Sequence, residues 1–375
     1  MVRYAILLLL LLQASNSYLY AQELTSNFNS DNEKLLLQRI KNYELTERDY
    51  FISNIKKGSF PDIDTILLSL DTEQGILKYS DEGNNQLRIG KIGRGPFEYI
   101  NPSIVYYDTK DDNIFVWDAS QLKLIQYDSQ GKGIKEFTDF RWSWGDFVIN
   151  DSTLFFYNNG KSSGKYIQEY HLESSEIIKK FGHIDQQHAF FKIYEGSGGL
   201  AQKSNYIYYV SPSKLKVNRI NTDDYTEYSK TIHDPDFEVP HIKNAAEIIS
   251  RGKQKISELM RDASIVLDVY ALENYLVLMA QVGKQFYNPK AGFYTMEKKK
   301  IKFYVLDYGS LDLVDTFTFS LAINKKLQHE FWSANKNHLI YISQYPIDND
   351  VNSVLKNPNT YKVHYFAIKD VNGTN

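Results

Sequence analysis

The sequence contains no cysteine. Disulfides, thiolate metal sites and cysteine nucleophiles are therefore excluded, as is lipid attachment through an N-terminal cysteine, and stability must come from the packed core alone. The chain also lacks a strong excess of either charge, with 43 Lys and Arg against 46 Asp and Glu and a formal net charge of −3. Because proteins that bind nucleic acid carry a concentrated basic face, we expect no nucleic-acid partner.

Long apolar runs are missing after the first residues of the chain. At the N-terminus, Arg3 precedes an apolar run from Ala5 to Leu12, and the small residue Ala21 follows a polar stretch. This order predicts a signal peptide over residues 1–21, with a permanent anchor as the alternative. We expect the mature protein to be periplasmic or extracellular, without a transmembrane span, and monomeric.

Aromatic residues are abundant, at 14% of the chain with 29 Tyr and 21 Phe. Such residues suit pleated, half-buried strands better than helices, so the composition predicts an all-β fold.

From residue 61 to about residue 370 the chain repeats one pattern: a short apolar strand, a polar turn and a second, alternating strand. The first strands of successive units start 40 to 69 residues apart, near Ile66, Ile114, Leu154, Ile207, Leu276 and Leu339. A unit of this kind cannot bury both of its faces alone, and six such units are best satisfied by radial packing. The pattern therefore predicts a six-bladed β-propeller over residues 61–370.

Two segments lengthen the spacing, and a third precedes the repeats. The spacing of apolar residues from about 240 to 262 predicts a short helical insertion between blades 4 and 5, which begins with a capping box at Asn244 and Glu247. A polar excursion follows around Asp348. Residues 22–60 form a lead-in with a short helix expected at 33–40. Within it, an extended stretch from Tyr50 to Ile55 is a candidate for the strand that closes the ring.

Two stretches resemble known propeller repeats. Ile114 to Asp128 resembles the strand-turn-strand of NHL-type repeats, and Ile89 to Tyr99 resembles the G-x-G-P-x-E-(F/Y) turn between blades of TolB-like, six-bladed exported bacterial proteins. The resemblance is strong over residues 61–137. It implies a secreted or periplasmic propeller without established catalysis, and it offers no active-site residues to transfer. Phe97 stands where that family commonly has glycine, which predicts a different turn conformation.

Within this turn, the residues from Gly93 to Tyr99 suit a crossover between blades. Gly93 and Gly95 allow positive φ, and Arg94 and Glu98 are spaced to pair across the turn. The functional alternative is an anion-binding loop of backbone amides assisted by Arg94.

Two motifs fit chemical signatures only in part. Gly160 to Gly164 reads G-x-S-x-G, but strands are expected on both sides, whereas a nucleophile elbow needs a helix after it. Asp348 to Asn352 alternates oxygen ligands as a calcium loop does, yet Ser353 and Asn359 stand where an EF-hand needs Gly and Glu. We interpret both as loops, and a looser calcium site stays open for the second.

The remaining candidates are histidines and tryptophans. His183 and His188 lack the helical context of a zinc site, although histidines from different blades could still meet at the channel. Trp142 and Trp144 share one face of a strand, where they would fill the space between blades or stack on a ligand.

No catalytic, cofactor-binding or metal-binding residue is predicted. Our first hypothesis is a non-catalytic exported binding module for an extracytoplasmic protein, peptide or glycan. The second is a glycan-active lyase or hydrolase with a site at the central channel, which requires acids, histidines or tyrosines from several blades to converge. The third is a structural role in a cell-envelope assembly. A polar funnel favours a ligand, and a flat apolar face favours a protein partner.

Overall fold

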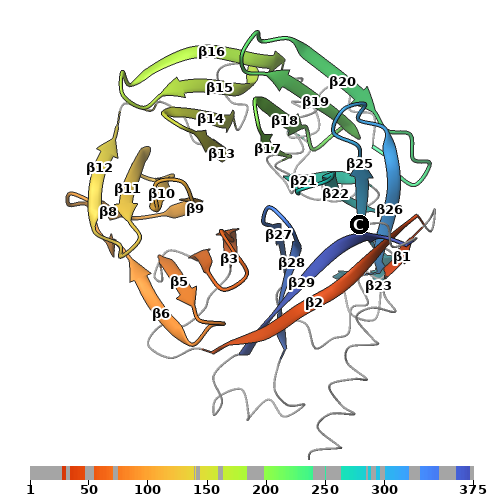
Figure 1. Cartoon of the computed structure of the whole chain (residues 1–375), viewed down its shortest axis with the longest axis horizontal. Helices are drawn as coiled ribbons and strands as arrows, with labels where there is room; N and C mark the ends of the chain where they lie inside the picture. The colour runs from red at the N-terminus through yellow and green to blue at the C-terminus, as the bar shows by residue number, and fades with distance from the viewer. Residues whose placement is uncertain are drawn as a thin grey trace, which may run out of the picture.

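The computed structural model is an all-β ring of six four-stranded antiparallel blades, one of which carries a fifth strand (Figure 1). The residues it describes are 28–30, 34–46, 55–70, 75–138, 140, 144–158, 164–183, 198–239, 250, 263–283, 286–288, 293–295, 300–320, 330–345 and 360–371.

Within each blade the chain runs from the inner strand, at the centre of the ring, to the outer one. Blade 1 contains β3 (Ile55–Ser59), β4 (Ile66–Leu70), β5 (Ile76–Ser80) and β6 (Asn85–Ile89). Blade 2 contains β9 (Pro102–Asp108), β10 (Asn113–Asp118), β11 (Lys123–Asp128) and β12 (Gly133–Phe137). Blade 3 contains β13 (Trp144–Asn150), β14 (Thr153–Asn158), β15 (Lys165–His171) and β16 (Glu176–His183).

The second half of the ring has the same inner-to-outer arrangement, except that an N-terminal strand is outermost in blades 5 and 6. Blade 4 contains β17 (Gly199–Lys203), β18 (Tyr206–Val210), β19 (Lys216–Asn221) and β20 (Glu227–Thr231). Blade 5 contains β21 (Ile265–Ala271), β22 (Leu276–Val282), β25 (Lys300–Leu306) and β26 (Leu313–Ser320), with β1 (Phe28–Ser30) added outside β26. Blade 6 contains β27 (Glu330–Ala334), β28 (Leu339–Tyr345), β29 (Thr360–Asp370) and β2 (Leu35–Thr46).

The predicted repeat is confirmed. Each of the six apolar strands expected from the sequence is the second strand of a blade, and each pairs with the alternating strand that follows it in the repeat. The second position is buried on both faces by neighbouring blades, which is why these strands are the most continuously apolar and the easiest to find in the sequence.

The ring is closed by a strand from the lead-in, but not by the expected one. β2 pairs with β29 along its whole length, from Leu35 opposite Asp370 to Thr46 opposite Thr360. The helix expected at 33–40 is wrong, since these residues begin this strand. Ile55 starts the inner strand of blade 1, and Tyr50 lies outside the described residues.

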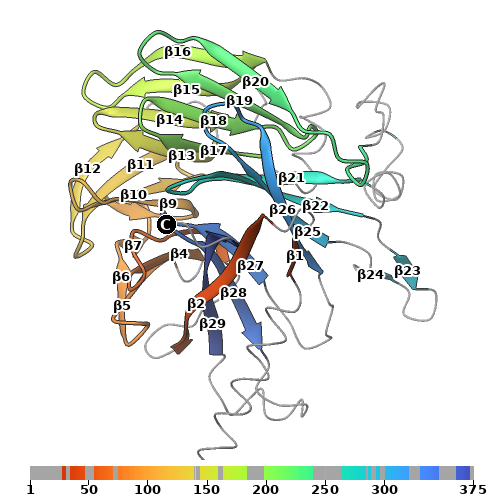
Figure 2. The same ribbon diagram turned by 45° about the vertical axis from the view of Figure 1, so that its right-hand side comes forward.

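Two further pairs lie outside the blades. β7 (Lys91–Ile92) and β8 (Glu98–Tyr99) form a short parallel pair within the connection between blades 1 and 2. β23 (Phe286–Asn288) and β24 (Phe293–Thr295) form a hairpin that projects away from the ring (Figure 2). The helical insertion expected at 240–262 lies outside the described residues except for Ser250. In the part of the chain that the structure describes, no helix has the length and apolar character needed to cross a membrane.

The hydrophobic core lies between adjacent blades rather than within one central mass. Among the described residues it divides into six clusters, one at each interface between neighbouring blades. At the interface of blades 2 and 3, the Trp144 ring stacks on Trp117 at 3.7 Å and on Phe156 at 3.5 Å between centroids. Packing is therefore the role of Trp144, while Trp142 lies outside the described residues.

The direction of the strands places the connections on two opposite faces of the ring. The connections from second to third strands, and from each blade to the next, start and end at the same face, which we call the insertion face. The longest of them span residues 184–198, 232–264, 283–299 and 346–359. On the opposite face the longest connections are much shorter and span residues 60–65 and 307–312. The long connections therefore lie on the insertion face.

Candidate functional site

Three charged side chains meet across the central channel. Lys57 Nζ lies 2.8 Å from Asp146 Oδ2 and 3.1 Å from Asp268 Oδ2. The three residues stand on the inner strands β3, β13 and β21, which surround the centre of the ring (Figure 1). These strands belong to blades 1, 3 and 5, which are not neighbours, so the contacts can form only through the channel. We call Lys57, Asp146 and Asp268 the channel triad.

A β-bulge precedes each member of the triad. The pairing register shifts between Ile55 and Lys57, between Trp144 and Asp146, and between Val266 and Asp268. A bulge adds one residue to a strand and turns the following side chain, and such features are frequent next to active and binding sites. The same irregularity thus occurs on alternate inner strands and re-aims one charged residue on each.

The two aspartates are held in matching ways. In each, Oδ1 accepts the backbone N–H of the next residue at 2.9 Å, from Phe147 and Val269 respectively, while Oδ2 accepts from Lys57. The corresponding positions on the other three inner strands, read from the register with the second strands, are Ile104, Gly199 and Phe331. Charged and uncharged positions therefore alternate around the channel.

Gly199 is needed beside this site. A Cβ atom on Gly199 would lie 2.0 Å from Asp268 Oδ1, which is far inside a van der Waals contact. Any other residue at this position would push the Asp268 carboxylate away from Lys57. Glycine at this position is explained by close approach rather than by its backbone conformation.

Partial burial shapes the electrostatics of the triad, whose side chains are 22%, 16% and 14% exposed for Lys57, Asp146 and Asp268. Burial raises the pKa of Asp268 to about 6, an effect that the Lys57 charge opposes and the Asp146 charge reinforces. Burial alone would lower the pKa of Lys57, but the two carboxylates outweigh it and raise that pKa above its ordinary value. Lys57 is therefore protonated at neutral pH and is not a nucleophile.

The chemistry open to this arrangement is narrow. Both carboxylates contact the same ammonium group, Lys57 Nζ. A glycosidase needs the space between its two carboxyl groups for the scissile bond. Among the described residues, no group of three His, Asp or Glu side chains is placed to hold a metal ion. The triad can, however, donate and accept hydrogen bonds at the same place.

None of the three triad residues was predicted from the sequence. Each aspartate is the single charge in an otherwise apolar or aromatic strand, in W-G-D-F-V-I and in I-V-L-D-V-Y. A lone charge in a strand with no polar neighbour is a usable signal for a position that faces a channel. The signal does not say which blades contribute, because the meeting of blades 1, 3 and 5 is set by ring closure.

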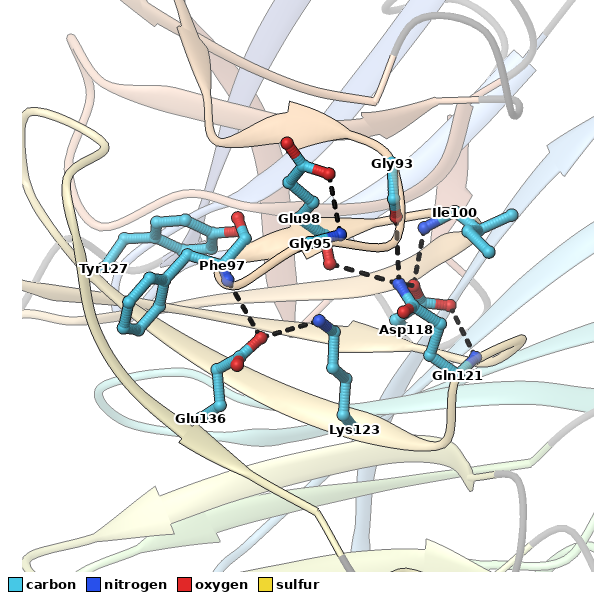
Figure 3. A network of polar contacts seen from close by, with 10 residues as sticks. All are labelled: Gly93, Gly95, Phe97, Glu98, Ile100, Asp118, Gln121, Lys123, Tyr127 and Glu136. Atoms are coloured by element: carbon cyan, nitrogen blue, oxygen red, sulfur yellow. Dashed lines mark hydrogen bonds and ion pairs between the residues drawn. The ribbon is translucent and has the colours of Figure 1, made fainter.

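The second polar network anchors the connection between blades 1 and 2 (Figure 3). Glu136 Oε1 accepts the Phe97 N–H at 3.0 Å and pairs with Lys123 Nζ at 2.6 Å. Asp118 accepts the Ile100 N–H at 2.6 Å, and the Gln121 side chain donates to Asp118, to the Glu98 carbonyl and to the Gly93 carbonyl. Burial opposes ionisation of Asp118, but the hydrogen bonds outweigh it and the pKa of this carboxyl falls below its usual range.

The backbone conformation of this turn can be compared with what its glycines allow. Phe97 takes the left-handed conformation, with φ of 55°, whereas Gly93 and Gly95 do not adopt the positive φ that glycine allows. Glu98 accepts the Gly95 N–H at 2.8 Å, and within the described part of the chain no ion pair joins Glu98 to Arg94. Since intramolecular acceptors already use the amides of Gly93, Gly95, Phe97 and Glu98, the anion-binding alternative is not supported.

The contact between Phe97 and Gly133 gives a test of this anchor. A Cβ on Gly133 would lie 2.2 Å from the Phe97 ring. We expect Gly133→Ala to lower the free energy of unfolding by about 2 kcal/mol, because the ring must move from a position fixed by its backbone. Gly164→Ala is the control, since no atom lies within 4 Å of its Cβ and only the φ of 66° opposes it. Urea unfolding of both variants should show the larger loss for Gly133→Ala, and equal losses would contradict the steric account.

The remaining sequence motifs do not form a site. Gly164 lies between β14 and β15, which pair as an antiparallel hairpin, so this turn lacks the strand-to-helix context of a nucleophile elbow. Ser162, the calcium-like loop at Asp348 and His188 lie outside the described residues, and His183 ends β16 at the outer edge of blade 3. Asp112 and Asp224 lie in turns between strands.

Comparison with known proteins agrees with this architecture. Residues 40–345 match the family model DUF5128, described as a 6-bladed beta-propeller. The chain belongs to this family. No curated protein matches the sequence.

Two solved structures that are similar to this DUF5128 protein come from Bacteroides species. A member of the DUF4221 family from Bacteroides vulgatus has 12% sequence identity and a TM-score of 0.64, over 90% of this chain and 99% of that one. A Bacteroides fragilis protein, described as exported, has 14% identity and a TM-score of 0.60, over 91% and 97%. At these identities the likeness shows the fold, and function must be argued from the site.

Proposed function

We propose that this DUF5128 protein is a non-catalytic binding module that acts outside the cytoplasm as a monomer. The observation that carries the proposal is the engagement of both channel carboxylates by one ammonium group, Lys57 Nζ. An acid and base pair needs carboxyl groups that are free to exchange protons with a substrate. The triad is instead arranged as a fixed set of hydrogen-bonding groups.

Features of the sequence and of the fold support export and recognition. The N-terminal segment has the order of a signal peptide, and one structural neighbour is described as exported. The turn at Gly93 to Tyr99 also resembles that of TolB-like exported propellers. Long connections confined to the insertion face provide the surface on which a protein, peptide or glycan would be recognised.

The enzyme hypothesis retains one supporting observation. Burial raises the pKa of Asp268 to about 6, the range of a carboxylic acid that protonates a leaving group, and a second carboxylate is close by. In that case Lys57 would have to leave the gap when substrate enters. We rank this second because the ammonium group contacts both carboxylates directly.

A turnover assay separates the two functions. The full chain is incubated with neutral and uronic-acid polysaccharides, and new reducing ends and unsaturated products are measured over time. We expect no turnover above a heat-treated control. Turnover that is lost in both Asp146→Asn and Asp268→Asn would overturn the binding function and establish a glycan-active enzyme.

A further inference from the structure

The channel triad has hydrogen-bonding capacity that its internal contacts do not use. Lys57 Nζ carries three N–H donors, and two of them serve Asp146 and Asp268. Within the described residues, the third N–H has no acceptor. Among the described residues, each carboxylate oxygen accepts one bond, which leaves a second lone pair available. The site therefore presents a donor flanked on both sides by acceptors.

Solvent reaches these groups. Their side chains are 14% to 22% exposed although they lie at the centre of the ring. Gly199 lies directly beside Asp268 Oδ1, where a Cβ atom would be only 2.0 Å away, and so limits the positions that this carboxylate can take. Three groups are thus held in place on rigid inner strands, which is the arrangement that a specific binding site requires.

If the triad served only to join the blades, it would not need charged side chains. Taking charged groups out of water costs free energy, and well-packed apolar side chains usually join two elements at least as well as a buried ion pair does. The six interfaces between blades are in fact held by apolar clusters. The charges at the channel therefore call for an explanation other than ring stability.

The charge pattern selects the class of ligand. A cationic ligand would meet the Lys57 ammonium between the carboxylates, and an anionic ligand would meet two carboxylates around the ammonium. A hydroxyl group avoids both conflicts because it donates to a carboxylate and accepts from an ammonium at the same time. In the triad the Lys57 ammonium, a donor, lies between two acceptors, the carboxylates of Asp146 and Asp268. Neighbouring hydroxyls on a sugar ring can donate to the carboxylates and accept from the ammonium.

We propose that the channel triad, Lys57, Asp146 and Asp268, binds an uncharged, hydroxyl-rich ligand of the carbohydrate class. The inference rests on the proposed binding function and assigns that function a site and a ligand chemistry.

The test measures binding of the full chain to sugars that differ mainly in charge. N-acetylated chito-oligosaccharides are compared with their deacetylated, cationic forms, and galacto-oligosaccharides with anionic galacturonate oligomers, together with neutral gluco-, xylo- and manno-oligosaccharides. Dissociation constants are measured by isothermal titration calorimetry. We expect binding to be confined to one or more neutral members of the panel, with the charged counterpart at least about tenfold weaker.

Variants then place the site. Asp146→Asn and Asp268→Asn preserve side-chain shape, and each should weaken binding of the neutral sugar by about tenfold or more because a charge-assisted acceptor is lost. Lys302→Met is the matched control. It removes another buried pair, in which Lys302 Nζ lies 2.8 Å from Asp234 Oδ2, on the third strand of blade 5 and away from the channel. Its affinity for the sugar should equal that of the wild type.

The outcomes separate this inference from the function on which it rests. Neutral sugar binding that both Asn variants retain would overturn the triad as the site and leave the binding function standing. Failure of every neutral sugar to bind, or a preference for a charged member, would overturn the ligand class. Loss of affinity in Lys302→Met equal to that in the Asn variants would attribute the effect to stability and overturn the assignment. Turnover of a bound sugar would overturn the proposed function itself.

Discussion

Replacing Lys57 with methionine should lower the free energy of unfolding by about 3 kcal/mol at neutral pH, because two partly buried carboxylates then face each other without a counterion. The loss should shrink as the pH falls. Asp268 already has its pKa raised to about 6, and without Lys57 the pKa of this carboxyl rises further, so protonation relieves the repulsion in acid.

The sign follows from proton linkage. A carboxyl group whose pKa is higher in the folded than in the unfolded chain contributes stability at low pH, and that contribution is lost as the pH rises through the folded pKa. Urea unfolding of wild type and Lys57→Met at a series of pH values should therefore show a difference that is small near pH 4 and largest above pH 7. A difference independent of pH would show that the lost methylene packing, and not charge, explains the effect.

A triple variant provides the control. Lys57→Met combined with Asp146→Asn and Asp268→Asn removes all three charges, and we expect it to recover most of the stability lost in Lys57→Met alone. A triple variant no more stable than the single one would contradict the view that unpaired carboxylates cause the loss.

Protonation of His364 should make the protein sensitive to acid. This side chain is 3% exposed on β29, its ring stacks on Tyr341 with centroids 6.0 Å apart, and neither ring nitrogen has a hydrogen-bond partner among the described residues. Burial lowers the pKa of His364 to about 3, and the charges of Arg39 on β2 and Lys362 on β29 contribute to the same shift. The imidazole is therefore neutral in the fold.

The expected change of the free energy of unfolding with pH has a definite sign. Between pH 6.5 and 3 the unfolded chain binds a proton at this histidine and the folded chain does not, so stability falls as the pH falls. The contribution is about 1.4 kcal/mol per pH unit inside this window, or about 2 kcal/mol between pH 6.5 and 5. Thermal unfolding should show that His364→Phe loses less stability than the wild type over this range.

An exposed histidine distinguishes this effect from general acid sensitivity. His233 lies at the surface, and His233→Gln should follow the pH dependence of the wild type. If His364→Phe also follows the wild-type curve, the buried imidazole does not set the acid limit. Because His364 lies directly opposite Asn42 of β2, its protonation would act on the strand that closes the ring.

The second strand of each blade could be predicted because its signal is local. The run from Ile114 to Asp118 is apolar and is followed by a turn, and no distant residue is needed to identify it. The start of β2 could not be predicted in this way. Leu35 and Leu37 are buried while Leu36 is 53% exposed, which is the alternation of a strand, yet the same letters suit a short helix. The strand conformation of these residues is decided by their pairing with β29, which lies more than 300 residues away in the sequence.

The site was harder to predict for the same reason. Lys57, Asp146 and Asp268 are far apart in the chain, and no known motif surrounds any of them. Only ring closure brings blades 1, 3 and 5 together at the channel. The turn at Gly93 to Tyr99 was predicted in place but not in detail, since Phe97 takes a left-handed conformation and its ring lies beside Gly133, a residue distant in the sequence.

Binding of a neutral sugar at the channel triad can be observed directly. The most direct measurement is a crystal structure of the full chain with the neutral oligosaccharide that binds it most tightly. Our account predicts sugar hydroxyls within hydrogen-bond distance of Lys57 Nζ and of at least one of the two carboxylates, Asp146 or Asp268. Sugar bound only at the outer strands or the loops, with the three triad side chains still paired only with one another, would contradict it.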